Sequence, residues 1–157
     1  MKIVLVVIGK TDKDYLREGV RLYCSRIGHY VPFRMVEIPD IKGMSSLGKE
    51  QVKEKEADLI LKYARPSDEV VLLDERGKER DSVTWASGLQ ERFLRDSRDL
   101  VFVIGGPYGF SKRVYDRADA LMSLSRMTFS HQMARLIFLE QLYRAFTIIK
   151  GEPYHHG

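Results

Sequence analysis

The sequence has few of the residues that mark extracellular or membrane proteins. Only one of its 157 residues is a cysteine, Cys24, so the chain forms no internal disulfide and no zinc site built on paired cysteines. Its first apolar run, residues 1–8, ends at Gly9 and has no cleavage-like tail, so it is too short to span a membrane and is no signal peptide. We therefore expect a soluble cytoplasmic protein with no membrane segment and no metal centre.

The fingerprints of several nucleotide-binding and hydrolytic folds are also missing. A dinucleotide-binding G-x-G-x-x-G would need glycine where Pro107 stands, and no Gly-Lys-Ser/Thr follows a glycine run. The G-x-S-x-G turn of the α/β-hydrolases is absent too. The sequence therefore argues against a Rossmann dehydrogenase, a P-loop nucleotide hydrolase and an α/β-hydrolase.

The composition that remains is typical of one globular domain. Hydrophobic residues make up 44% and charged residues 31% of the chain, which is the balance of a packed and ordered protein. A length of 157 residues suits a single domain, residues 1–157. The net charge is +4, and residues 111–157 hold seven cations against four anions. Most of the positive excess is thus in the last third, which suits a polyanionic partner.

The spacing of apolar residues predicts alternating strands and helices. Strands are expected at residues 2–8, 33–38, 69–73, 100–104 and 121–125, and helices at residues 12–30, 49–64, 82 onward, 111–120 and 131–150. The expected helix ends are Thr11 with Asp14, which have capping-box spacing, then the N-caps Ser82, Ser111 and Ser130, and Gly151 at the last C-terminus.

This order of elements indicates an α/β fold with a mainly parallel sheet and helices on both faces. In such sheets, ligands bind beyond the carboxyl ends of the strands. The loops after Leu73, Ile104 and Ser125 are therefore the candidate site.

The segment FVIGGPYGF, residues 102–110, is the strongest local signal for a ligand. Three glycines in five positions, the first of them Gly105, directly follow a buried strand. Glycine lets the backbone take positive φ and approach a flat ligand closely. The alternative interpretation is a tight strand-to-helix turn that binds nothing.

The segment SLSRMTFSHQMAR, residues 123–135, is the second candidate. It places small polar side chains, a methionine and an aromatic just before the last helix, whose free backbone N–H groups could hold a polar ligand group. The alternative interpretation is a loop closed by an N-cap at Ser130.

The C-terminal segment is the third candidate. Glu140 and Arg144 are four residues apart, and a solvated ion pair on one helix face is the plainest interpretation of that spacing. Tyr154 and His155 add aromatic rings near these charges, and cations interleaved with aromatics can hold phosphates and stack unpaired bases. The alternative interpretation is a mobile terminus.

Taken together and in order, these segments become specific. LDERGK with Ser82, FVIGGPYG, SLSRMTFSHQMAR and EQLYRAFTIIKGEPYHH closely resemble the ribosomal RNA large subunit methyltransferase H family, a small group of SPOUT methyltransferases. The resemblance spans the whole chain, including the start MKIVLVVIGK. Members of the family often have proline at the position of Ser130, a change at a helix start that should leave the loop intact.

The resemblance implies a SPOUT-type fold with a C-terminal trefoil knot, an obligate homodimer and S-adenosylmethionine as methyl donor. It implies transfer of the methyl group to N3 of a pseudouridine in 23S ribosomal RNA within the assembled ribosome. The cofactor-binding residues that it implies are Leu73, Gly105, Leu124, Ser125, Arg126, Met127, Thr128 and Phe129.

In this interpretation the C-terminal segment serves the RNA. Because the imide N3 must lose a proton, a base is required, and the candidates are His155, Glu140 or a group of the RNA. Arg144, Tyr154 and His155 are expected to hold RNA near the methyl donor.

Two arginines are expected to contact phosphates on the ground of charge alone, namely Arg126 and Arg135. Two other hypotheses stay open. One is a small α/β module that binds a nucleotide or a flavin without methyl transfer, and the other is an RNA-binding factor with no catalysis.

Overall fold

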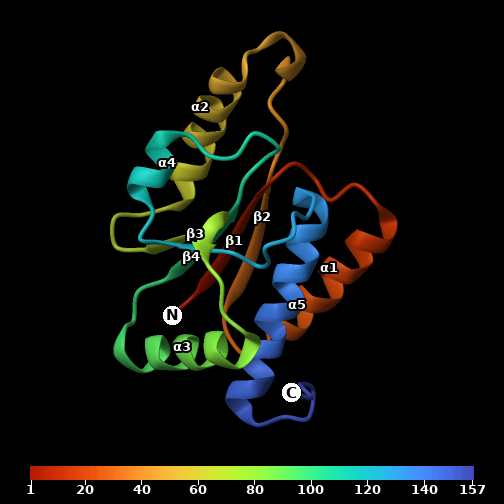
Figure 1. The fold of residues 1–157 in the computed structure, drawn as a ribbon, viewed down its shortest axis with the longest axis vertical. Coiled ribbons are helices and arrows are strands. Elements are labelled where there is room, and N and C mark those ends of the chain that lie inside the picture. The colour runs from red at the N-terminus through yellow and green to blue at the C-terminus, as the bar shows by residue number, and fades with distance from the viewer.

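The computed structural model describes residues 1–157, except for the side chain of Met44, as alternating strands and helices (Figure 1). The strands are β1 (Ile3–Ile8), β2 (Phe33–Ile38), β3 (Glu69–Lys78), β4 (Leu100–Ile104) and β5 (Ala120–Met122). The helices are α1 (Asp14–Ile27), α2 (Lys49–Ile60), α3 (Ser82–Arg95), α4 (Lys112–Arg117) and α5 (His131–Lys150), with short 3₁₀ turns η1 (Met44–Ser46) and η2 (Leu61–Tyr63).

The strands form one parallel sheet in the order β2-β1-β4-β3-β5. Ile3 of β1 pairs with Phe33 on one side and with Leu100 on the other. β1 and β4 are apolar and buried along their whole length, as expected for parallel strands that are covered on both faces. The predicted α/β fold with a parallel sheet is confirmed, and all carboxyl ends of the strands share one edge.

Helices cover both faces of this sheet, as predicted. On one face α1, α3 and α5 pack on a core that includes Phe102 and Phe138, whose ring centroids are 4.8 Å apart. On the other face α2 and α4 pack on a second core that includes Val103 and Val114. Side chains of this size each contribute about 1.5 to 3 kcal/mol when they are fully buried. The two cores hold the sheet rigid beneath its carboxyl edge.

Two predicted N-caps, those of α1 and α3, are wrong. The N-cap of α1 is Lys13, without a side-chain hydrogen bond, whereas Thr11 is buried and its hydroxyl donates to Glu37 at 2.5 Å. The N-cap of α3 is Asp81, whose carboxylate accepts the N–H of Thr84 at 2.7 Å. A serine and an aspartate are both good caps, so the sequence could not choose between neighbours at positions 81 and 82.

The edge of the sheet near β5 differs most from the prediction. β3 continues past a register shift between Leu73 and Lys78, and β5 is shorter than expected and starts one residue earlier, at Ala120. A Cβ on Gly77 would lie 2.5 Å from backbone atoms of Met122. Only glycine allows these two backbones to approach so closely. The trefoil knot stays a prediction.

The last helix, α5, begins and ends at the residues that the sequence predicts. Ser130 caps α5 by accepting the N–H of Met133 at 3.1 Å, and Gly151 ends it with φ of +69°, both as predicted. The 20 residues of α5 span about 30 Å at 1.5 Å per residue. The chain end therefore lies far from the start of α5, beside α1 and the C-terminal end of α5 (Figure 1).

α4 is shorter than predicted, because it ends at Arg117 rather than near residue 120. Ser111 precedes it as expected, but its hydroxyl is buried and has no hydrogen-bond partner. Among the described residues, no helix is both long and apolar enough to cross a membrane.

Candidate functional site

The carboxyl edge of the sheet carries a cavity of about 760 Å³. Its walls come from the part of β3 beyond Leu73, the loop after β4, and the loop between β5 and α5. Every residue that the sequence assigned to the cofactor lines it, namely Leu73, Gly105, Leu124, Ser125, Arg126, Met127, Thr128 and Phe129. The structure thus brings together three segments whose residues, from Leu73 to Phe129, are up to 56 residues apart in the chain.

The glycine loop after β4 is shaped by close packing more than by unusual dihedral angles. Gly109 alone among its glycines has positive φ, +81°, so the expected positive φ holds at one position only. A Cβ on Gly105 would lie 2.9 Å from the ring of Phe110, and one on Gly106 would lie 2.8 Å from a carboxylate oxygen of Glu56. The loop therefore passes directly over two side chains that larger residues would displace.

Glu56 lies buried under this loop, and sequence analysis did not single it out. Its residue is 3% exposed, and burial first, then the charge of Asp40, raises its pKa from 4.5 to about 7. The signal in the sequence was its spacing, since Glu56 lies four residues from both Val52 and Ile60 of the apolar stripe of α2. A carboxyl group thus supports the floor of the cavity.

The loop before α5 is held by its own serines. The hydroxyl of Ser123 donates to the carbonyl of Ser125 at 2.9 Å, and the Ser125 hydroxyl accepts the N–H of Met127 at 3.0 Å. Met127 remains 77% exposed and Phe129 36% exposed. These two apolar side chains stand at the mouth of the cavity, where a ligand or a second protein surface can cover them.

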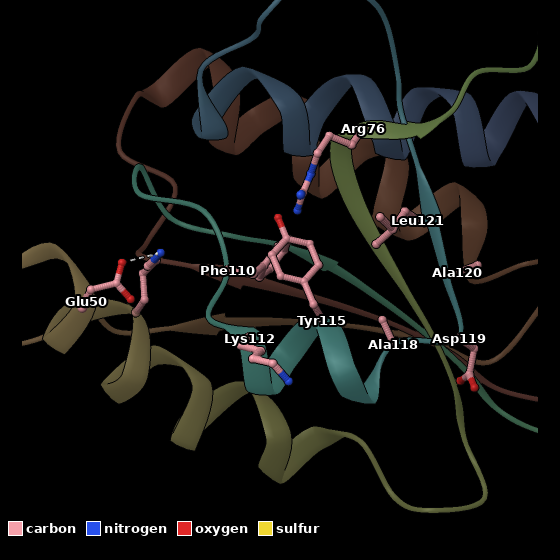
Figure 2. Close-up of a pocket in the computed structure, with 10 residues that line it drawn as sticks. Glu50, Arg76, Phe110, Lys112, Tyr115, Ala118, Asp119, Ala120 and Leu121 are labelled. Carbon is pink, nitrogen blue, oxygen red and sulfur yellow. Dashed lines mark ion pairs between the residues drawn. The ribbon is translucent and has the colours of Figure 1, made fainter.

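Arg76 and Tyr115 line both this cavity and a neighbouring one (Figure 2), and Asp74 lines this cavity beside them. Asp74 accepts the Tyr115 hydroxyl and the N–H of Arg76 at 2.8 Å, and the Arg76 guanidinium lies 4.6 Å from the centroid of the Tyr115 ring. Burial alone would raise the pKa of Asp74, but these hydrogen bonds lower it on balance. The neighbouring cavity, of about 700 Å³, also contains the Glu50–Lys53 ion pair at 2.9 Å.

The candidate RNA-binding residues form one cluster at the other end of α5. Arg144 donates to both carboxylate oxygens of Glu140 at 2.9 and 3.1 Å and to Nδ1 of His155 at 3.0 Å. Its guanidinium also lies 4.8 Å from the centroid of the Tyr154 ring. Because guanidinium only donates, Nδ1 of His155 accepts and carries no proton. The sequence predicted this set correctly as neighbours, and the terminus is folded against α5.

The cluster and the cofactor cavity do not meet within one chain. Arg144 lies ten residues beyond Ala134, the last residue of α5 that lines the cavity, and that length of helix spans about 15 Å. The structure therefore separates the two groups that the sequence interpretation placed around one substrate.

The expectation that Arg135 contacts phosphate is wrong. Its side chain is fully buried and donates to the carbonyls of Ile8 and Gly9, each at 2.9 Å, and to the hydroxyl of Thr11 at 3.0 Å. Glu37 lies 3.6 Å away as its ion-pair partner. Arg135 fixes α5 to the end of β1, whereas Arg126 is exposed. Over the described part of the chain, no three His, Cys, Asp or Glu side chains are grouped to hold a metal ion.

Comparisons with known proteins agree with this architecture. The family model described as "Predicted SPOUT methyltransferase" matches residues 1–155. Curated relatives named ribosomal RNA large subunit methyltransferase H are 55% identical in Parabacteroides distasonis and 54% identical in Christiangramia forsetii, each over 156 residues and 99% of both chains.

Solved structures share the fold at low sequence identity. The probable methyltransferase of Bordetella pertussis Tohama I has a TM-score of 0.55 and 10% identity, over 91% of this chain and 93% of that one. A methyltransferase structure from Legionella pneumophila, in complex with SAM, has a TM-score of 0.50 and 16% identity, over 92% and 66%. The chain thus belongs to the ribosomal RNA large subunit methyltransferase H family of SPOUT methyltransferases.

Proposed function

We propose that this protein transfers a methyl group from S-adenosylmethionine to N3 of a pseudouridine in 23S ribosomal RNA of the assembled ribosome. One observation carries the proposal: the three segments assigned to the cofactor line a single cavity at the carboxyl edge of the sheet. The names of the relatives support a large-subunit RNA substrate. We also propose that residues 1–157 act as one domain and that the protein works in the cytoplasm.

The cavity fits a nucleoside joined to an amino acid. Its volume of about 760 Å³ is within the usual range for ligand pockets of this class. Leu73, Ile104, Leu124 and Phe129 give it apolar walls for a flat base, and Asp74 adds a carboxylate for hydroxyl or ammonium groups. These residues, with the backbone of the glycine loop, would hold the cofactor, which supplies a methyl group on a sulfonium sulfur when bound.

The tail cluster supplies groups suited to deprotonating an imide. Nδ1 of His155 has a lone pair that faces an N–H of Arg144 at 3.0 Å. A substrate N3–H that replaced this N–H would find a base at hydrogen-bond distance. Arg144, released from His155 but still paired with Glu140, would then stabilise the negative charge on the imide. Tyr154 would give the target nucleobase an aromatic surface on which to stack.

We propose that two copies of the chain are needed to complete the site. Arg144 of the tail cluster and the cavity are about 15 Å apart along α5, so a second copy in antiparallel contact would bring its cluster to the cavity of the first. Tyr15, Leu22 and Met133 are large exposed apolar side chains on the outer surface of α1 and α5, as an isologous interface would require. Arg126 would lie at the rim of such a site, where RNA phosphates pass.

The function can be tested by binding and by product analysis. The protein should bind S-adenosylmethionine in calorimetry. It should also add one methyl group to ribosomes purified from cells that lack the protein, as measured by mass spectrometry of rRNA nucleosides. His155→Ala should keep cofactor binding and lose methylation. Absence of cofactor binding up to millimolar concentration would overturn the proposal, and binding of ribosomes without the cofactor would favour a non-catalytic RNA-binding factor.

A further inference from the structure

A smaller cavity of about 310 Å³ lies between α3 and α5, next to the cofactor cavity. The two cavities share Ser123, Leu124 and Phe129 as a common wall. A pocket of this volume is at the lower end of the range for small-molecule sites. It therefore suits one pyrimidine ring and is too small for a whole cofactor or a dinucleotide.

The polar groups of this small cavity are set in a defined direction. The Gln141 amide nitrogen donates to Glu140 at 3.2 Å, and the Ser82 hydroxyl is 2.6 Å from the Gln141 amide oxygen. A carboxylate only accepts hydrogen bonds, so the amide must turn its NH₂ toward Glu140 and its carbonyl toward Ser82. One N–H and one oxygen lone pair of the Gln141 amide therefore remain free.

We propose that this small cavity receives the target base. Gln141 binds the edge of the base at which an N–H group lies next to a C=O group. The free N–H and free lone pair of an amide are complementary to such an edge and form two parallel hydrogen bonds with it. Trp85 and Phe129 provide aromatic surfaces in the same cavity, and bases stack on such rings. The proposal rests on the methyl transfer proposed above and assigns its substrate recognition.

The linkage of the ring to its sugar decides how well it fits. A uracil ring attached through carbon has two N–H groups, so Gln141 can pair with N1–H and C2=O while N3 stays open to the methyl donor. A uracil ring attached through N1 has only the N3–H, which is the reacting position itself. Gln141 and Ser82 would therefore select pseudouridine over uridine and also orient N3.

Two cations stand at the rim of the small cavity. Lys78 and Arg80 are exposed and line this cavity together with one carboxylate, that of Asp81. Phosphates on either side of the target nucleotide would meet positive charge there, which fixes the RNA without reading its sequence.

The test replaces the amide and compares two substrates. Gln141→Met keeps the length of the side chain but removes both hydrogen bonds. The substrates are ribosomes that carry pseudouridine or uridine at the target position, and kcat/KM is measured on each. The wild-type protein should prefer pseudouridine, and Gln141→Met should lose about tenfold on pseudouridine, the effect of about one net hydrogen bond, with little change on uridine.

Matched variants separate recognition from folding and from the function itself. Gln90→Met changes an exposed glutamine of α3 and should behave as the wild type on both substrates. Ser82→Ala frees the Gln141 amide to turn and should reduce the preference less than Gln141→Met does. Calorimetry should give unchanged affinity for S-adenosylmethionine in all three variants.

Three outcomes would overturn the proposal. They are an equal loss on both substrates with Gln141→Met, an unchanged preference for pseudouridine, and a weakened cofactor affinity that accounts for the loss. If instead the wild-type protein binds no cofactor and methylates neither ribosome, the proposed function itself fails, and the two failures are thereby distinguished.

Discussion

Replacing Arg135 by methionine tests how the last helix is fixed to the sheet. Arg135 is fully buried and donates to the Ile8 and Gly9 carbonyls at 2.9 Å and to the Thr11 hydroxyl at 3.0 Å. Methionine fills much of the same space, but it leaves these acceptors without their donor and removes the ion-pair partner of Glu37. Orphaned buried acceptors cost about 1 to 3 kcal/mol each, partly offset by removing a buried charge, so we expect a loss of about 3 to 5 kcal/mol.

Urea unfolding followed by circular dichroism measures this loss directly. With a slope near 2 kcal/mol per molar urea, the midpoint should fall by about 2 M. The loop before α5 should loosen as well, so cofactor affinity should also fall. Arg126→Met, a change of the same kind at an exposed position, should alter stability by less than about 0.5 kcal/mol. A loss below about 1 kcal/mol for Arg135→Met would refute the reasoning.

Two further predictions concern Glu56 and the close approach of β3 to β5. Between pH 4.5 and about 7 the folded chain holds a proton on Glu56 that the unfolded chain has lost, so the contribution of Glu56 to the free energy of unfolding should fall by about 3 kcal/mol as the pH rises through this range. Glu56→Gln should remove this slope, and identical pH profiles of urea unfolding for both proteins would contradict the assignment. Gly77→Ala places a Cβ 2.5 Å from the backbone of β5 and should cost about 3 kcal/mol or prevent folding. Gly88→Ala, where nothing lies within 4 Å, should instead stabilise α3 by about 1 kcal/mol, and similar unfolding midpoints for the two glycine variants would show that the close approach carries no strain.

The sequence predicted the sheet and the position of the cavity because both depend on local pattern. Apolar runs such as residues 100–104 read as buried parallel strands, and parallel strands must open their loops on one edge. The residues expected at the cofactor, from Leu73 to Phe129, line one cavity for this reason.

The sequence could not predict contacts that depend on distant parts of the chain. Arg135 looks like a surface cation until the carbonyls at the end of β1 are placed beside it. Likewise, β3 extends to Lys78 only because Gly77 admits the backbone of β5. The separation of Arg144 from the cavity follows from the straightness and length of α5, which no local motif encodes.

The bonds made by Arg135 also bear on when this protein can fold. Its partners are Ile8, Gly9 and Thr11, so these hydrogen bonds near the start of the chain form only after residue 135 has been synthesised. The pairing of β1 with β4 also requires residues that are synthesised much later than β1, since the register pairs Ile3 with Leu100. A nascent chain emerging from the ribosome therefore cannot close its central strands early, and pairing across such sequence distances is slow. Folding is therefore completed after synthesis, when α5 docks on the sheet and Arg135 forms its hydrogen bonds with the segment that follows β1.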